Sequence, residues 1–378
     1  MTNNVSSDKK SSTQTATKTP RVSVVIVTRN VEEYLAEAVQ SVLNQSYRDF
    51  ELIILDFGST DTSIEIARGF ASADKRIRLE QVLVKEVVEA RNAGCAFAQG
   101  EFIAVMDADD VSLAIRLEEQ VAILDRSPAV GLVGGGAEWI DGKGRSMWIL
   151  DFPAGDQEIK RELPRRFPFC HSAVTMRRSL FVKVGGYRPI FTTAHDYDLC
   201  LRLSEHCACA NVEKPVVRYR VHGSQLSLSR RKQQTFCKLA AQASANARRS
   251  GSADPLQSYS EITSETLRQM GVSEAIQQEN LVLDYCSWIH SIWRAGEDAV
   301  ALKAAEEAFQ LEWRPSQRVQ IADLYLMTAR LYWRKGQFLK TLRAALKAVF
   351  LRPALARNFL YPILWRLHIA RGYKAQCE

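Results

Sequence analysis

The sequence predicts an α/β protein built on a doubly wound, mostly parallel sheet, followed by a C-terminal α-helical region. Residues 22–27 form a nearly continuous β-branched run, which is typical of a strand buried on both faces. Similar apolar runs alternate with helical periodicity as far as residue 106, the pattern of strand–helix–strand units in a parallel sheet. Beyond about residue 230 the chain is rich in Ala, Leu and Arg at helical spacing.

The alternating elements can be placed one by one from their periodicity. The expected strands are residues 22–27, 51–55, 77–84 and 101–106, and the expected helices are residues 35–43, a segment through 64–67, and residues 90–99. In open sheets of this kind, ligands bind beyond the carboxyl ends of the strands. Thr28, Asp56 and Asp107 each follow one of these strands, so a binding site is expected where they meet.

The C-terminal part carries a weak internal repeat. Gly296 and Gly336 lie 40 residues apart, and each stands between two segments of helical periodicity. The second unit resembles a tetratricopeptide repeat, although two units are fewer than such an array normally needs; a plain helical appendage is an equal alternative. We expect a disordered tail over residues 1–20, a catalytic domain over 21–230 and a helical region over 231–378.

Composition indicates an ordinary globular protein of 378 residues with a formal charge of +7. Its eight cysteines are scattered and several lie in apolar runs, which favours a reducing, cytoplasmic compartment. We see no signal peptide, and no apolar run approaches the roughly 18 residues that span a bilayer. Any membrane contact is therefore expected to be peripheral.

The charge is concentrated near the C-terminus. From Arg330 to Lys374 there are eleven Lys or Arg and no Asp or Glu. Basic residues there flank apolar segments at 359–361 and 363–365, a pattern that fits contact with an anionic inner membrane surface. A solvated basic face and burial of these aromatics in a helical core are equal alternatives. Nucleic-acid binding is the weakest interpretation, because the segment contains no recognisable module.

Three carboxylates in four residues follow the strand at 101–106. They repel one another unless a cation or solvent compensates. Alternate residues at a strand end project to opposite sides, so Asp107 and Asp109 need not share one task. A hard divalent ion takes few carboxylates and completes its shell with diphosphate oxygens and water. The alternative is a loop of acids that cap the following helix.

Segments on both sides of this motif resemble family 2 glycosyltransferases, which have the GT-A fold, a Rossmann-like doubly wound sheet. The resemblance runs from about residue 21 to 227, and its main segments are residues 22–30, 38–47, 50–61, 90–94, 100–109, 170–178, 184–187, 195–203 and 217–222. Two positions depart from the family pattern. Phe57 stands where a second carboxylate is usual, and His195 replaces a Glu.

For the donor, the resemblance implies a nucleotide sugar, with Thr28 and Asp56 at its base. Asp56 can accept the imide proton of uracil, which favours a UDP-sugar. Arg91 would lie near the nucleotide and its phosphates, unless it only forms an ion pair with Glu89 or Glu101. Asp107 would meet the ribose.

The metal and the general base are also implied by the resemblance. Asp109 would hold a divalent metal, Mn²⁺ or Mg²⁺, and His222 would add a nitrogen ligand or meet the diphosphate. Asp196 would be the general base that deprotonates the acceptor hydroxyl, with Asp198 as second candidate. The alternative for Asp196 is a helix cap. Arg220 would offset leaving-group charge.

The resemblance implies an inverting transfer of a sugar to a hydroxyl of a glycan or lipid-linked acceptor, as in bacterial surface polysaccharide synthesis. The enzyme would work in the cytoplasm, and peripheral contact with the inner face of the membrane is a further expectation. Two alternatives stay open at this point. One is a nucleotidyltransferase on a related sheet, and the other is an inactive scaffold that binds partners through its helices. Sequence alone does not identify the sugar, the acceptor or the linkage.

Overall fold

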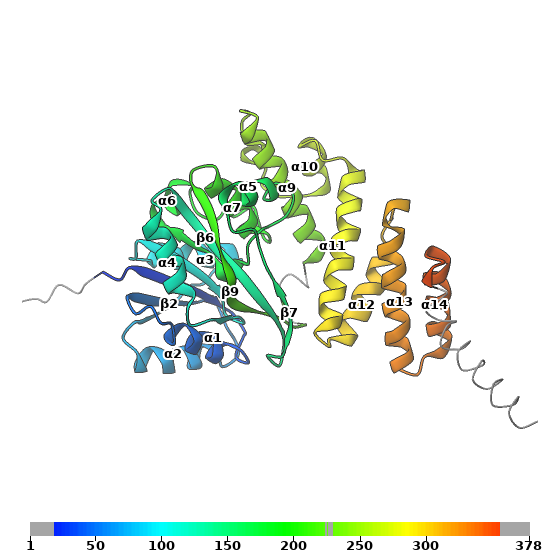
Figure 1. Cartoon of the computed structure of the whole chain (residues 1–378), viewed down its shortest axis with the longest axis horizontal. Coiled ribbons are helices and arrows are strands. Elements are labelled where there is room, and N and C mark those ends of the chain that lie inside the picture. The colour runs from blue at the N-terminus through cyan, green and yellow to red at the C-terminus, as the bar shows by residue number, and fades with distance from the viewer. Residues whose placement is uncertain (1–18, 224, 226–229, 356–378) are drawn as a thin grey trace, which may run out of the picture.

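We describe a computed structural model of the chain over residues 19–223, 225 and 230–355. The predicted disordered tail, except for its last two residues, and the apolar segments at 359–365 lie outside this part of the chain. The described residues form a sheet region and a row of helices beside it (Figure 1). A boundary near residue 230 stays our prediction.

A nine-stranded sheet forms the centre of the sheet region. Its order is β3-β2-β1-β4-β8-β6-β9-β5, and β7 pairs with β6. The strands are β1 (Val22–Thr28), β2 (Phe50–Asp56), β3 (Ile77–Gln81), β4 (Phe102–Asp107), β5 (Val111–Ser112), β6 (Val130–Asp141), β7 (Ser146–Leu150), β8 (Thr175–Arg177) and β9 (Ala208–Val221).

The expected parallel sheet is present in the first four strands, and the rest is mixed. β1 pairs in parallel with both β2 and β4, and β2 pairs in parallel with β3. β8 then runs antiparallel to both β4 and β6, while β6 and β9 are parallel. The antiparallel pairs of β8 join segments that lie far apart in the chain, so tertiary packing decides the strand direction there.

Helices cover both faces of the sheet, as a doubly wound fold requires. Side chains of β1 alternate between the faces, because Val24 and Ile26 belong to one apolar core and Val25 to the other. The sheet-region helices are α1 (Leu35–Leu43), α2 (Ser63–Ala73), α3 (Val87–Phe97), α4 (Arg116–Arg126), α5 (Asp156–Glu162), α6 (Arg178–Lys183) and α7 (His195–Ser204). The first core packs α1 and α4, and the second packs α3 and α7.

The helical region continues from the second of these cores. Phe236 and Leu239 of its first helix share that core with Tyr197 of α7. Its helices are α9 (Arg231–Arg249), α10 (Ser264–Gln269), α11 (Glu274–Arg294), α12 (Asp298–Ala308), α13 (Arg318–Arg334) and α14 (Phe338–Leu351). Gly296 and Gly336 have φ of 85° and 68°, so each makes the left-handed turn between two helices of a pair. The predicted helix–Gly–helix units are confirmed.

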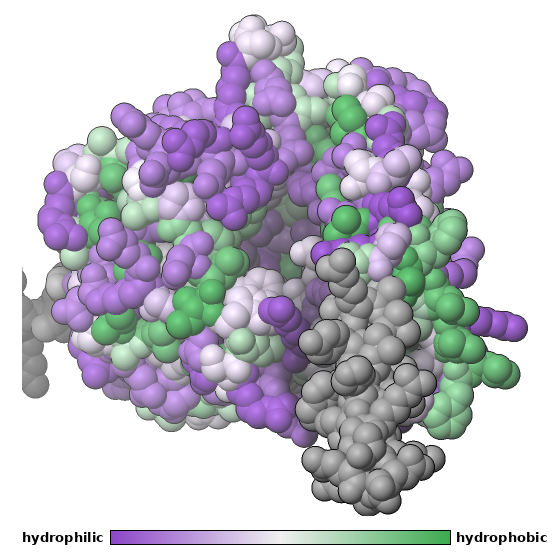
Figure 2. Space-filling view, turned by 45° about the vertical axis from the view of Figure 1, so that its right-hand side comes forward, coloured by the Kyte–Doolittle hydropathy of each residue, from purple (hydrophilic) through white to green (hydrophobic). Residues whose placement is uncertain are grey.

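Helix α14, the last helix among the described residues, turns its small residues inwards and its large apolar residues outwards. Ala344 and Ala348 are its buried residues. Its exposed large apolar residues are Phe338, Leu339, Leu342, Leu346 and Phe350. In Figure 2 hydrophobic side chains gather at the right, on the outer side of the last helices. A terminal repeat normally presents a polar outer face, so this face is unusual for a helix in contact with water alone.

Two expectations from composition can be compared with the described residues. The seven cysteines among them are free thiols, and Cys377 lies outside this part. Among residues 19–223, 225 and 230–355, no helix has the length and hydropathy needed to cross a bilayer.

Candidate active site

Thr28 and Asp56 lie side by side at the carboxyl ends of β1 and β2. Thr28 and Asp56 are register partners, and they are 1% and 2% exposed. Oδ1 of Asp56 accepts from the backbone N–H groups of Gly58 and Ser59, at 3.1 and 3.2 Å. Oδ2 of Asp56 and Oγ1 of Thr28 have no hydrogen-bond partner within the described structure. Buried polar atoms are rarely left unpaired, so this pair fits a ligand that donates a hydrogen bond, as a nucleobase does.

Phe57, the first departure from the family pattern, lies beside this pair. Its side chain is nearly buried, and it packs with Leu55 and Ala90. The guanidinium of Arg29 lies 5.5 Å from the centre of its ring. The carboxylate usual at this position is therefore replaced by an apolar wall with a cation over it, while Asp56 stays in place.

Arg91 of α3 makes an ion pair with Asp107, not with either predicted glutamate. Its Nη2 donates to Oδ1 of Asp107 at 2.5 Å. Glu89 caps the start of α3, and Glu101 pairs with other arginines. Burial alone would raise the pKa of Asp107, but the Arg91 guanidinium outweighs burial and holds that pKa below its usual range. Asp107 is therefore a fixed, ionised acceptor at the end of β4.

His171 joins this pair to the general-base candidate, and our sequence reasoning did not single it out. Its Nε2 lies 2.5 Å from Nη1 of Arg91, and its Nδ1 lies 3.8 Å from Oδ2 of Asp196. Burial and the neighbouring Arg91 lower the pKa of His171, so the ring is neutral near pH 7. Because arginine only donates, Nε2 must accept and Nδ1 carries the proton that faces Asp196.

Asp109 and His222 meet on the other side of Asp107. Nε2 of His222 lies 3.0 Å from Oδ2 of Asp109. A carboxylate is a ligand for either Mn²⁺ or Mg²⁺ when diphosphate and water complete the shell, and an imidazole nitrogen suits Mn²⁺ better than the harder Mg²⁺. Within the described ranges, no cluster of three or more His, Cys, Asp or Glu could hold a metal by itself. The two residues therefore fit a metal that is shared with a bound diphosphate.

The third carboxylate of the motif has a structural role. Asp110 is buried, and its side chain accepts from the backbone N–H of Arg220 at 2.7 Å and from Ser172 Oγ. Burial and then the nearby Asp109 raise the pKa of Asp110 well above its ordinary value. Both of its oxygens are thus used by the protein.

Arg220 is also committed to the protein. It is 2% exposed. Its Nε donates to the backbone carbonyl of Asp109 at 2.8 Å, and its Nη2 donates to Glu37 at 2.6 Å. It thus holds the Asp109 turn in position, and its role in offsetting leaving-group charge stays a prediction.

Asp196 lies in the first turn of α7. The preceding Ala194 adopts a left-handed conformation with φ 49°, which is costly for a residue other than glycine. The Asp196 side chain keeps 22% exposure, so an acceptor can reach it. His195, the second departure, is buried with its Nδ1 unpartnered in the described structure. Burial, Arg91 and His171 lower the pKa of His195, which is neutral near pH 7.

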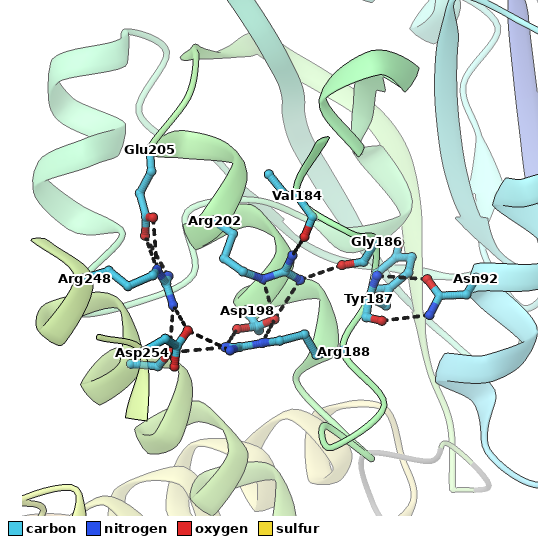
Figure 3. Close-up of polar contacts among 11 residues, drawn as sticks. Asn92, Val184, Gly186, Tyr187, Arg188, Asp198, Arg202, Glu205, Arg248 and Asp254 are labelled. Atoms are coloured by element: carbon cyan, nitrogen blue, oxygen red, sulfur yellow. Dashed lines mark hydrogen bonds and ion pairs between the residues drawn. The ribbon is translucent and has the colours of Figure 1, made fainter. Parts of the chain in front are cut away.

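Asp198, the second candidate base, is not available for catalysis. Its side chain is fully buried. Arg188 and Arg202 both pair with it (Figure 3). Arg202 also donates hydrogen bonds to the backbone carbonyls of Val184 and Gly186, and so ties α7 to the loop before it. Asp198 is therefore a structural anchor for α7, two residues from Asp196.

The predicted residues thus gather at one edge of the sheet. Thr28 and Asp56 form one group, and Asp109 and His222 form a second. A continuous series of contacts runs from Asp107 through Arg91 and His171 to Asp196.

Comparison with known proteins identifies the family. Residues 23–185 match the model of glycosyl transferase family 2, a range that includes the strand ends but stops before Asp196. The chain is 34% identical over 197 residues to the "Putative glycosyltransferase EpsE" of Bacillus subtilis, which covers 49% of this chain and 67% of that relative. It is 29% identical over 214 residues to the "O-antigen biosynthesis glycosyltransferase WbnJ" of Escherichia coli, covering 55% of this chain and 82% of WbnJ.

A solved structure shows the same fold over most of the chain. S. aureus TarS 1-349 in complex with UDP-GlcNAc aligns over 86% of this chain and 90% of its own length, with a TM-score of 0.51 and 15% identity. That similarity extends beyond the sheet region and supports the α/β architecture with a helical region. With the EpsE and family-model matches, it follows that the chain belongs to glycosyl transferase family 2.

Proposed function

We propose that this chain is an inverting, metal-dependent glycosyltransferase that moves a sugar from a UDP-linked donor to a hydroxyl of a glycan or lipid-linked acceptor. The observation that carries the proposal is the pair of buried, unpartnered atoms on Thr28 and Asp56, at the same edge as Asp107 and Asp109. A role in cell-envelope polysaccharide synthesis is supported by the printed name of WbnJ, an O-antigen enzyme.

On the donor side, the proposal assigns one task to each strand end. Oδ2 of Asp56 accepts the imide proton of uracil, and Thr28 Oγ1 meets a polar atom of the same ring. Asp107, ionised and held by Arg91, accepts from a ribose hydroxyl. The TarS structure in complex with UDP-GlcNAc supports a UDP-sugar donor. Asp109 and His222 would hold Mn²⁺ or Mg²⁺, which as a Lewis acid offsets charge on the diphosphate.

On the acceptor side, Asp196 removes the proton of the attacking hydroxyl. The neutral His171 turns its Nδ1–H towards Oδ2 of Asp196, which lies 3.8 Å away. With one base and no covalent intermediate, the acceptor oxygen displaces the UDP group in a single step. A single displacement inverts the configuration at the anomeric carbon. The protein's contribution is mainly positioning and charge compensation.

A panel of nucleotide sugars tests this function. The protein is mixed with UDP-, GDP-, CDP- and TDP-sugars, with and without Mn²⁺, and both thermal unfolding and donor hydrolysis are measured. We expect the UDP-sugars to raise the unfolding temperature most, and only with metal, because ligands that bind the native state stabilise it. An inactive scaffold predicts no response to any donor, and that result would refute the proposal.

We also propose peripheral contact with an anionic membrane through α14. Leu339, Leu342, Leu346 and Phe350 follow one another at helical spacing on its exposed side. Lys340, Arg343 and Lys347 form a basic row next to them. From Leu324 to Leu355 the chain has seven Lys or Arg and no Asp or Glu. Two copies of this face would repel each other, whereas an anionic surface attracts each nearby cation by about 1 kcal/mol.

Flotation with liposomes tests the membrane contact. The full chain should float with phosphatidylglycerol-containing vesicles, and not with purely phosphatidylcholine vesicles. The double variant L342Q/L346Q should lose flotation, because both leucines are exposed and their replacement removes apolar contact without opening the core. L83Q/V182Q is the matched control, since it replaces two exposed apolar residues elsewhere. Equal flotation of both variants would exclude α14 as the contact.

A further inference from the structure

A large cavity lies where the sheet region meets the helical region. Its volume is about 850 Å³, and it is lined from Gly223 after β9, from the start of α9, and from α11 and α12. A second cavity of about 400 Å³ shares Arg230, Gln233, Ile262 and Thr263 with it, so the two form one continuous groove. Figure 2 shows the surface hollowed between the two regions.

The groove is lined by residues that lie close in sequence to both sides of the candidate active site. At one end Gly223 directly follows His222, which contacts Asp109. At the other end Thr192 lies four residues before Asp196. The groove thus begins beside the metal-site residue His222 and ends in the loop before α7, on the side of the site where the proposed base lies.

The lining is strongly cationic. Its cations are Arg230, Arg231, Lys232 and Lys303, and its carboxylates are Glu307 in the larger cavity and Glu261 in the smaller one. The arginines have ion-pair partners, Glu86 for Arg230 and Glu307 for Arg231. Lys232 and Lys303 are exposed and form no ion pair with any residue the structure describes.

Arg231 also has unused hydrogen-bonding capacity. Its side chain is 14% exposed, and its Nε is buried without a partner among the described residues. The rings of Tyr285 and Trp288 lie 5.2 and 5.8 Å from its guanidinium carbon, which keeps the group in the wall of the groove. Oxygen atoms of a phosphate are the acceptors that a planar, partly desolvated guanidinium binds best.

Apolar side chains complete the groove. Phe236, Ile262 and Val300 line the larger cavity together with Tyr285. These side chains can pack against the apolar face of a sugar ring or the first units of a lipid chain. The cations can pair with a phosphate attached to either group.

We infer that the groove is an acceptor site for a phosphate-bearing acceptor, in which Arg231, Lys232 and Lys303 hold the phosphate. This inference rests on the proposed glycosyltransferase function. The phosphate belongs either to a phosphodiester-linked glycan or to the diphosphate headgroup of a lipid-linked acceptor, and the two sources share the chemistry that the groove recognises.

The test uses the full chain with saturating UDP and Mn²⁺, so that the donor site is filled. Binding of three probes is measured by calorimetry: a glycerol phosphate oligomer, farnesyl diphosphate, and farnesol, which lacks the phosphate. We expect one phosphate probe to bind and farnesol not to bind. Which phosphate probe binds distinguishes the glycan source from the lipid source.

The variant K232Q/K303Q should weaken binding of that probe at least about tenfold, because two charge-assisted contacts are lost. K75Q/K183Q, which removes two exposed lysines elsewhere, should bind the probe like the wild type. Failure of both phosphate probes to bind, or equal binding by the two double variants, would overturn the inference while UDP binding persists. Loss of UDP binding by the wild type would instead refute the donor assignment on which it rests.

Discussion

Replacing Asp56 by Asn should separate donor binding from stability. In Asp56→Asn, Oδ1 can still accept from Gly58 and Ser59, so the turn after β2 is kept. The buried, unpartnered Oδ2 becomes an amide NH₂. That group donates where the imide N–H of uracil also donates, so a hydrogen bond to a charged acceptor is replaced by two donors facing each other.

The magnitude follows from that change. A hydrogen bond to a charged group contributes about 1.5–3 kcal/mol, and an unmatched polar contact adds to the loss. We expect UDP to lose about 2–3 kcal/mol, or roughly 30- to 150-fold in affinity. The unfolding temperature without ligand should change little, because Oδ1 keeps its two backbone hydrogen bonds and Oδ2 has no partner to lose among the described residues. Cytosine has an acceptor at the equivalent ring position, so the preference for UDP over CDP should narrow or invert.

Calorimetric titration of UDP and CDP in Mn²⁺, with thermal unfolding of the free protein, measures these effects. Asp125→Asn removes an exposed carboxylate that pairs with Arg21, and it should leave the affinity for UDP unchanged. A UDP affinity within about threefold of wild type would show that Asp56 does not contact the base. A fall of several degrees in the unfolding temperature of the free variant would show that Asp56 is mainly structural.

Three further predictions address the rest of the site. Asp196→Asn should reduce sugar transfer by about 10²- to 10⁴-fold with UDP affinity retained; full transfer would exclude it as the base. His222→Ala should raise the Mn²⁺ concentration needed for donor hydrolysis, and EDTA should abolish hydrolysis in the wild type; unchanged metal dependence would remove His222 from the metal site. Burial lowers the pKa values of His171 and His195, so below about pH 6.5 the unfolded chain binds more protons than the folded chain. The free energy of unfolding therefore falls as the pH falls through that range, by at most about 1.4 kcal/mol per pH unit for each histidine. Between pH 7.5 and 5.5, the unfolding temperature of His195→Gln should therefore fall by less than that of the wild type. Equal falls would contradict the lowered pKa of His195.

The first half of the sheet and the donor edge could be predicted because their determinants are local. The β-branched run predicts strand β1, and Thr28, Asp56 and Asp107 are the last residues of β1, β2 and β4. The order of residues along the chain then determines which edge they share. The mixed half of the sheet has no such pattern, because β8 is only three residues long and its pairing with β4 and β6 is decided by tertiary packing.

The roles of several polar residues depend on contacts between distant segments, and the sequence does not reveal these contacts. Arg220 pairs with Glu37, 183 residues away. His171 reaches Arg91 across 80 residues, although it stands in a segment that resembles the family. A basic or acidic residue near a motif therefore predicts charge at the site, and only the fold shows whether that charge faces the ligand or the protein.

The position of the general-base candidate depends on the helical region as much as on the sheet. Asp198 anchors α7 through Arg188, and Arg188 also pairs with Asp254, which lies beyond the end of α9 (Figure 3). Asp254 in turn pairs with Arg248 of α9. Breaking a buried ion pair of this kind is costly, because it leaves a charge without compensation. Helix α9 also lines the cationic groove, so the groove and Asp196 are held by one network. The helical region thus supports the position of Asp196, and under our proposal it is a structural part of the acceptor side.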